Sequence, residues 1–476
     1  MPKLRRCAGG LAFLLLIASV CGGQVPAPAP PLPAAARQRL RQAAAEVDAG
    51  RAAAAIAGLR QLAREYPRSA AVAETLGLAF IQQQQLATAL PRLRLAVSLA
   101  PNSPAMLANL GITELRLGDL RQGIRRLRQA VALEPRGDPG NFDNIYDLGQ
   151  ALAEASNYPE AASWLARAHA LRPGRPDVAY NWALAAHRAH RNAAAARALG
   201  SVSALAQSAQ AQALWGTVAE AQGQYENAAR HFQAAVHLAP TAANFLALGV
   251  EFLRHLTWNA ARLTFQRGLR RYPHDRRLRT ALGITDFGQS DFSGAVETFG
   301  ALSAAHPLDP YLAAMLGRSC LQGGMARQAP CQALIAQAAA HPSNPAAAAY
   351  AAVIALNGGS SPAAAARALR LARRAVRDDP RLAEAQFAVG LALGRSGHWR
   401  QSIPSFQAAL RWDPGDATAI FQLALAYQRT GQSALAQNML RRHAQLAADQ
   451  RRVTNRRLAH VRQFVTRIGK AAGGSR

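Results

Sequence analysis

Apolar residues recur along this chain at intervals of three and four positions, the spacing that places side chains on one face of an α-helix. The stretch 215–240, WGTVAEAQGQYENAARHFQAAVHLAP, contains two such helices of about a dozen residues each, separated by the turn QGQY. Gly216 in the first helix is followed by Ala228, Phe232 and Pro240, which lie 12, 16 and 24 positions later. This pattern predicts a helical hairpin that begins again after each proline.

The same offsets recur along the chain. Small residues follow 12 positions after each anchoring glycine, and a leucine or phenylalanine follows 16 positions after most of them; the anchors are Gly77, Gly111, Gly149, Gly216, Gly249, Gly283, Gly317 and Gly390. We expect the small residue to face the glycine and the larger residue to fill the groove between one hairpin and the next. Proline ends the second helix because it cannot continue the hydrogen-bond ladder. One hairpin cannot bury its apolar stripe alone, so the units must stack.

The unit resembles the tetratricopeptide repeat, whose glycine, small, aromatic, small and proline positions match the residues above. The resemblance implies an all-α fold, a right-handed α-solenoid or superhelix of stacked antiparallel helix pairs. About twelve units fit residues 36–443, with degenerate copies near 176–208 and 345–380. The resemblance also implies that the first helices of the pairs line a concave surface. The interruptions RGDPG (136–140) and NGGSSP (357–362) are the expected places for a loop or a change of superhelical pitch.

The N-terminus has the pattern of a signal peptide over residues 1–23. Lys3, Arg5 and Arg6 precede the ten-residue apolar run 11–20, which is too short to span a bilayer. An exported protein, periplasmic or associated with the cell envelope, is therefore expected. A lipid anchor at Cys21 is an alternative, although the bulky Val20 before it matches that signal poorly. Residues 24–35, rich in proline and alanine, predict an extended tether.

Basic residues exceed acidic ones by 55 − 27 = 28, and only Lys3 and Lys470 among them are lysines. Such a surface attracts anionic partners. Part of the excess lies in residues 444–476, where a basic C-terminal capping helix and tail are expected. An apolar stripe of this helix is formed by Leu446, Val453, Val461, Phe464 and Ile468. The helix is either a terminal cap or a contact with an anionic membrane surface or an acidic protein; nucleic acid is the least expected partner.

No catalytic motif occurs in the sequence: there is no phosphate-binding glycine loop, nucleophile elbow or paired carboxylate signature. We therefore expect no enzyme activity, no cofactor and no metal. His187 and His190 share a helical face, but no acidic or cysteine ligand lies near them in the sequence. Cys320 and Cys331 either form a disulfide between adjacent helices or lie separately as small buried residues.

The partner-binding surface is expected on the concave face, at slots of the first helices close to the glycine. Arginine recurs five positions after the glycine or its replacement, and aromatic residues join it; the candidates are Arg116, Arg188, Arg254, Phe287, Arg318, Phe387, Arg395, Phe421 and Arg429. Guanidinium groups beside apolar side chains suit an acidic segment, extended or helical. The sequence thus predicts a non-catalytic envelope adaptor for other proteins. The alternatives are an envelope structural protein that contacts lipid or glycan through its C-terminus, and a regulatory subunit of an enzyme bound in trans.

Overall fold

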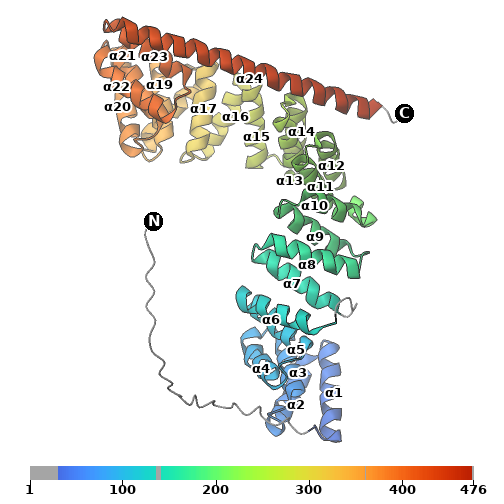
Figure 1. Ribbon diagram of the computed structural model, residues 1–476. Helices are drawn as coiled ribbons and strands as arrows, with labels where there is room; N and C mark the ends of the chain where they lie inside the picture. Colours follow the sequence, from blue (N-terminus) through green and yellow to red (C-terminus); the bar gives the residue numbers. More distant parts are fainter. Residues whose placement is uncertain (1–30, 136–140, 360, 474–476) are drawn as a thin grey trace, which may run out of the picture. The chain divides into compact units, whose positions relative to one another are not determined.

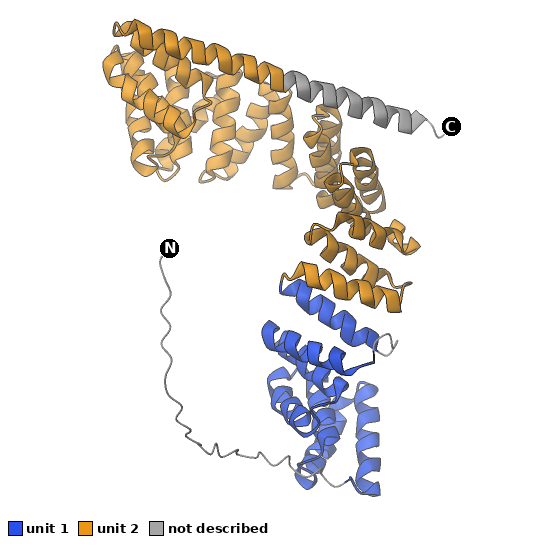
Figure 2. Ribbon diagram, viewed as in Figure 1, with its two compact units in different colours: residues 1–155 blue, residues 156–476 orange. Residues whose placement is uncertain are grey.

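The computed structural model describes residues 31–135, 141–359 and 361–473, with side chains as far as Val453. In these ranges every regular element is a helix (Figure 1). The chain divides into two compact units, residues 1–155 and 156–476 (Figure 2). The predicted all-α solenoid of stacked antiparallel helix pairs is confirmed.

The first unit contains seven helices among its described residues: α1 (Ala34–Asp48), α2 (Ala52–Glu65), α3 (Ala70–Gln82), α4 (Leu86–Leu99), α5 (Pro104–Arg116), α6 (Leu120–Leu133) and α7 (Phe142–Glu154). Within the unit, each helix from α1 to α6 packs against the next one in the sequence, and α7 is the last helix of the unit. The first helices of successive pairs also touch, as α1 does with α3.

The second unit repeats this arrangement through α8 (Tyr158–Leu171), α9 (Pro176–Arg188), α10 (Asn192–Gly200), α11 (Ala209–Ala221), α12 (Tyr225–Leu238), α13 (Ala242–Arg254), α14 (Trp258–Arg271), α15 (Arg276–Gly288) and α16 (Phe292–Ala305). It continues with α17 (Pro310–Gln322), α18 (Ala329–Ala340), α19 (Pro345–Gly358), α20 (Pro362–Asp378), α21 (Ala383–Arg395), α22 (Trp399–Trp412), α23 (Ala417–Arg429) and α24 (Ser433–Gly473). The first helices α17, α19 and α21 pack directly on one another, and α19 is buried along most of its length.

The repeated glycine receives the large residue that follows it 16 positions later. A methyl group added at Gly249 would lie 2.1 Å from the Phe265 ring, and one at Gly216 would lie 2.9 Å from Phe232. Phe265 is fully buried. The ring therefore packs against the glycine of its own hairpin, because the missing side chain of the glycine leaves room for it between the two helices. Phe232 and Phe265 also belong to a core cluster that includes Phe245 and Leu278 of the following hairpins, as expected for a residue between one hairpin and the next.

Gly317 is the exception. The residue 16 positions later is Ala333, which is too small to cover it. The ring of Tyr350 from α19 covers it instead, and an added methyl group would lie 2.3 Å from this ring. The hairpin of α17 and α18 is thus completed by the first helix of the next pair.

Local sequence signals set the helix ends. Ser69, Ser103 and Asp309 stand two residues after a proline and accept hydrogen bonds from backbone N–H groups of the helix they precede. The turns between paired helices need a left-handed residue, which is Gly223 in one hairpin (φ 73°) and Leu256 in another (φ 53°). The leucine adopts a conformation that is uncommon for a residue with a branched side chain.

Two predicted boundaries differ in the structure. The expected capping helix of residues 444–476 is not a separate element, because α24 runs without a break from Ser433 to Gly473. No proline occurs in this helix, and its first glycine is Gly469, so nothing in the sequence ends it at the array's expected limit. The degenerate copy near 176–208 has a short second helix, α10, followed by a 3-10 helix at Ser203–Gln207.

Several predictions concern segments outside the described residues. These are the signal peptide, Cys21, most of the tether and the interruption at 136–140, together with the side chains of Val461, Phe464 and Ile468. Of the expected C-terminal stripe, Leu446 packs against the core cluster of α19 to α23, whereas Val453 is exposed.

Candidate partner-binding site

The predicted partner-binding residues all lie on first helices of the pairs or at their ends. Their helices are α5 for Arg116, α9 for Arg188, α13 for Arg254, α15 for Phe287, α17 for Arg318, α21 for Phe387 and Arg395, and α23 for Phe421 and Arg429. The arginines and Phe421 are exposed, while Phe287 and Phe387 are half-buried. Arg116 belongs to the first unit and the others to the second.

Most of these side chains contact other residues of the chain. Arg116 donates a hydrogen bond to Gln84 (2.8 Å), and the Arg429 guanidinium lies 5.9 Å from the centre of the Trp399 ring. The two half-buried rings also have aromatic neighbours, Phe292 for Phe287 and Phe406 for Phe387. These phenylalanines therefore contribute to packing between helices as well as to the surface.

Arg318 is held most firmly. Its Nε donates to the Tyr350 hydroxyl (2.7 Å) and its terminal nitrogen donates to Glu384 Oε1 (2.8 Å), while the Tyr350 hydroxyl donates to the same carboxylate (3.1 Å). Burial and the charge of Glu384 raise the pKa of Tyr350, so its hydroxyl remains a donor. The three residues come from α17, α19 and α21. We call them the Arg318 cluster; within it the arginine charge is already paired.

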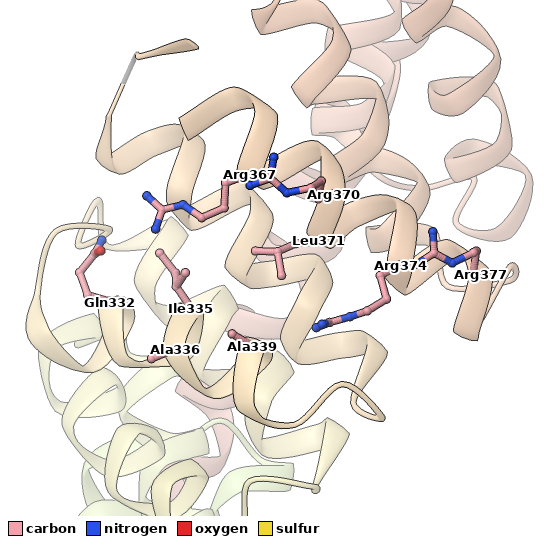
Figure 3. A pocket seen from close by; sticks show the side chains of 9 residues that line it. All are labelled: Gln332, Ile335, Ala336, Ala339, Arg367, Arg370, Leu371, Arg374 and Arg377. Carbon is pink, nitrogen blue, oxygen red and sulfur yellow. The ribbon is translucent and has the colours of Figure 1, made fainter. Parts of the chain in front are cut away.

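A different surface carries arginines that the sequence reasoning did not select. A groove of about 570 Å³ lies between α18 and α20. Figure 3 shows Ile335, Ala336 and Ala339 on one side of it and the arginines of α20 on the other. The groove is lined by Gln332, Ile335, Ala336, Ala339, Arg367, Arg370, Leu371, Arg374 and Arg377.

The four arginines of this groove stand at positions 367, 370, 374 and 377. Intervals of three and four residues place them on one side of α20. The opposite side of the helix is buried through Ala364, Ala368, Ala372 and Ala375. Alanine therefore lets α20 pack closely into the array, and its other side is left to arginine.

The arginines of α20 are not neutralised by carboxylates. In the part of the chain that the structure describes, none of the four forms an ion pair. Arg374 donates to the backbone oxygen of Ala338, but its Nε is buried without a hydrogen-bond partner. Arg367, Arg370 and Arg377 are exposed. The groove thus combines a small apolar floor with positive charges available to an anionic ligand.

The sequence contained a signal for this surface. Residues 366–378 read ARALRLARRAVRD, in which alanines and arginines each recur at helical spacing on opposite sides. The alanines mark a repeat. The arginine face can be distinguished from ordinary solvated charge only when the structure shows that its arginines form no ion pairs.

Cys320 and Cys331, for which a disulfide and separate burial were both open, are joined by a disulfide in the structure. The bond links α17 to the start of α18, with Cα atoms 5.9 Å apart, and both residues are fully buried. It therefore holds the hairpin that carries Arg318 and borders the arginine groove.

The tetratricopeptide repeat family model matches residues 40–104, 109–176 and 387–450. The chain belongs to the tetratricopeptide repeat family, as its repeated glycine, aromatic and proline positions predicted. Members of this family generally act as non-catalytic scaffolds for interactions between proteins. A search of curated proteins found no match.

Among solved structures, the Naa15/Naa10 complex with HypK-THB is 14% identical, with 85% of this chain and 68% of that chain covered and a TM-score of 0.40. Pseudomonas aeruginosa pilF is 18% identical, with 44% and 94% covered and a TM-score of 0.37. The APC/C hetero-tetramer Cut9–Hcn1 is 14% identical, with 91% and 96% covered and a TM-score of 0.36. At these scores the likenesses carry no information about the partners of this chain.

A search of the described helices for a membrane-spanning segment found none that combines sufficient length with sufficient apolar character.

Proposed function

We propose that this protein is an interaction scaffold of the cell envelope whose groove between α18 and α20 holds an acidic segment of a partner protein. The observation that carries this proposal is the arginine row of α20, Arg367, Arg370, Arg374 and Arg377, none of which forms an ion pair in the described part of the chain, although Asp378 ends the same helix. Unpaired positive charges above an apolar floor are the complement of a segment that carries both carboxylates and small apolar side chains.

The geometry of the row favours a linear ligand. The first and last arginines are ten positions apart on one helix, which corresponds to about 15 Å at the rise of an α-helix. Each guanidinium can hold a carboxylate through two parallel hydrogen bonds. A helical or extended segment with three or four acidic residues therefore matches the row in length and charge.

Residues 1–33 and residues 450–476 contain no aspartate or glutamate. We therefore take the acidic occupant of the groove to be a segment of another protein and not one of these two segments. The concave face predicted for the first helices remains a second proposed contact surface. Arg318 should contribute least to it, because its charge is already paired with Glu384.

The location in the envelope is also a proposal. It is supported by the leader pattern of residues 1–23 and by the Cys320–Cys331 disulfide, since such bonds persist in oxidising compartments. Fusing residues 1–40 to a phosphatase that is active only after export should give an active enzyme. Leu14→Arg, which interrupts the apolar run, should abolish that activity; an inactive parent fusion would contradict export.

Contact of the basic C-terminus with anionic lipid is the remaining proposed interaction. Residues 441–476 contain ten lysines and arginines and a single acidic residue, Asp449. Deleting residues 444–476 should then remove binding to anionic vesicles and leave binding of the acidic segment intact.

The groove is tested by fluorescence anisotropy of an acidic, alanine-rich helical peptide added to the full chain. Replacing the four groove arginines by glutamine should weaken binding about 100-fold, since four charge-assisted contacts of somewhat less than 1 kcal/mol each are lost. The matched control replaces four exposed arginines of α12 and α14, Arg230, Arg267, Arg270 and Arg271, which gives the same change of charge. Equal weakening in both variants would contradict a specific groove.

A further inference from the structure

Three potential metal ligands meet between two first helices of the second unit. Glu220 lies on α11, Glu251 on α13, and His255 directly follows the end of α13. His255 Nε2 lies 3.2 Å from Glu220 Oε2 and 3.4 Å from Glu251 Oε1. The ligand atoms of the three residues all lie within 4.8 Å of one another. We call this group the Glu251 cluster.

Glu251 is the most deeply buried acid of the described chain. Its side chain is 1% exposed, and neither carboxylate oxygen accepts a hydrogen bond. A carboxylate removed from water without hydrogen bonds is costly unless a cation compensates for it. This carboxylate therefore points into the cluster with its acceptor capacity unused.

The other buried acids are compensated differently. Glu114 has the Arg94 guanidinium at 3.4 Å, and Asp286 has that of Arg262 at 3.2 Å. Glu251 instead has a second carboxylate beside it, and the nearest guanidinium nitrogen, from Arg254, is 3.9 Å away. Burial and then the negative charge of Glu220 raise the pKa of Glu251 to about 8. The guanidinium nearest to Glu251 is thus farther away than those of Arg94 and Arg262 are from their acids, and it is shared with Glu220.

We propose that Glu220, Glu251 and His255 bind a divalent transition-metal ion such as Zn²⁺. Two carboxylate oxygens and one imidazole nitrogen form a ligand set that suits this class of ion. Two ionised carboxylates neutralise its charge of two. Coordination requires ionised carboxylates and an imidazole nitrogen without a proton, so protons held at the ligand atoms pass to solvent when the ion binds. The ion ties α11 to α13, and its remaining coordination positions are open to water.

The surroundings fit this assignment. The Tyr225 ring lies 4.4 Å from the His255 ring and fixes its orientation. Arg254 is the competing cation: its guanidinium nitrogen lies 3.9 Å from both Glu220 and Glu251, but its side chain is 55% exposed and extends from the rim. It can therefore turn toward solvent when a metal ion enters.

The test is calorimetric titration of the metal-free full chain with Zn²⁺. We expect each chain to bind about one Zn²⁺ ion tightly, with release of protons at pH 7. Glu251→Gln and His255→Gln should each weaken this binding by on the order of 100-fold, since even an outer partner of a ligand contributes about 10–100-fold. Arg254→Ala should tighten it, because the competing cation is gone.

The matched controls are Glu297→Gln and His274→Gln, which remove an exposed acid and an exposed histidine of the same unit. Both should keep the tight equivalent. If Glu251→Gln loses its helical circular dichroism signal, Glu220→Gln, at a side chain 20% exposed, replaces it in the series. Absence of a tight equivalent in the parent chain would overturn the proposal, as would its retention in both the Glu251→Gln and the His255→Gln variants. Histidine bridging two acids without metal is then the role of the cluster.

Discussion

The Arg318 cluster and the Glu251 cluster both connect successive first helices within the second unit. In the Arg318 cluster, one guanidinium and one hydroxyl donate to a single carboxylate across α17, α19 and α21. In the Glu251 cluster, two carboxylates share one imidazole across α11 and α13, and the more buried carboxylate accepts no hydrogen bond. The two clusters occupy similar places but differ in charge balance.

This difference separates a structural link from a candidate binding site. A buried polar network stabilises a fold when every donor meets an acceptor. When a buried carboxylate is left without compensation, the chain is less stable by the free energy of its desolvation, and a cation that enters can recover it. Within one array of similar helices, charge balance thus distinguishes the two roles. Four predictions test this comparison.

Removing the tyrosine of the Arg318 cluster should have the largest effect. Tyr350→Ala leaves Gly317 uncovered and deletes the central hydrogen bonds, so the free energy of unfolding should fall by about 3–5 kcal/mol. Tyr350→Phe keeps the ring and should reduce it by only about 1–2 kcal/mol. Urea denaturation followed by circular dichroism measures both. A similar loss in both variants would mean that the ring does not support α17.

Reducing the disulfide should have the next largest effect. The bond closes a loop with a sequence separation of 11 residues, and opening such a loop should reduce the stability of the second unit by about 2–3 kcal/mol. Cys320→Ala/Cys331→Ala should behave like the reduced protein and should not respond to reductant. Proteolysis of α18 measures the local effect. An unchanged cleavage rate would contradict a supporting role for the disulfide.

In the Glu251 cluster, neutralising the acid should stabilise the metal-free chain. The pKa of Glu251 is raised to about 8, so the folded chain retains a proton that the unfolded chain loses above its ordinary value near 4.5. Stability therefore falls as the pH rises from there toward 8. Glu251→Gln should remove this fall. It should raise the free energy of unfolding by on the order of 1–2 kcal/mol at pH 8 and by little at pH 4.5. Melting curves with a chelator test it; destabilisation at pH 8 would refute it.

The smallest effect is expected for Glu384, with the opposite dependence on pH. Burial raises its pKa, but the hydrogen bonds from Arg318, the backbone and Tyr350, together with the charge of Arg318, outweigh burial and leave the pKa below its usual value. Its contribution is therefore present above the unfolded pKa and is lost as the pH falls through the lowered folded pKa. Glu384→Gln should lower the free energy of unfolding by about 0.5–1 kcal/mol at pH 7. The value is modest because Arg318 is half exposed. Melting curves from pH 7 to 3 should converge for the two proteins.

Much of the fold could be predicted from the sequence, because the repeat places its glycine, ring and proline at fixed offsets. The close contact of the Phe265 ring with Gly249 could not, since the offsets do not fix which neighbours a side chain meets. Nor could the cover of Gly317, because Tyr350 lies one repeat spacing of 33 residues later, in the first helix of the next pair, instead of at the offset of 16 where the other repeats carry their large residue. Helical periodicity describes one repeat, whereas these contacts depend on which helices become neighbours.

The candidate sites were less predictable for the same reason. Positions of Arg116, Arg254 and Arg318 on first helices follow from the register, but their pairing depends on residues 32 to 66 positions distant, such as Glu220 and Glu384. The sequence interval between Glu220 and His255 matches no metal-binding motif, so the Glu251 cluster is found only in three dimensions. Charge compensation is a property of neighbours rather than of spacing.

The cover of Gly317 by Tyr350 limits how this array can be rearranged. Repeats that supply their own ring can be duplicated, deleted or exchanged as independent modules, because each carries both halves of its contact. The module of α17 and α18 cannot be moved in this way, since the residue that covers its glycine, Tyr350, lies on α19. Recombination or protein engineering that cuts between α18 and α19 would leave the packing of α17 incomplete, so these two modules should be inherited and transplanted as one.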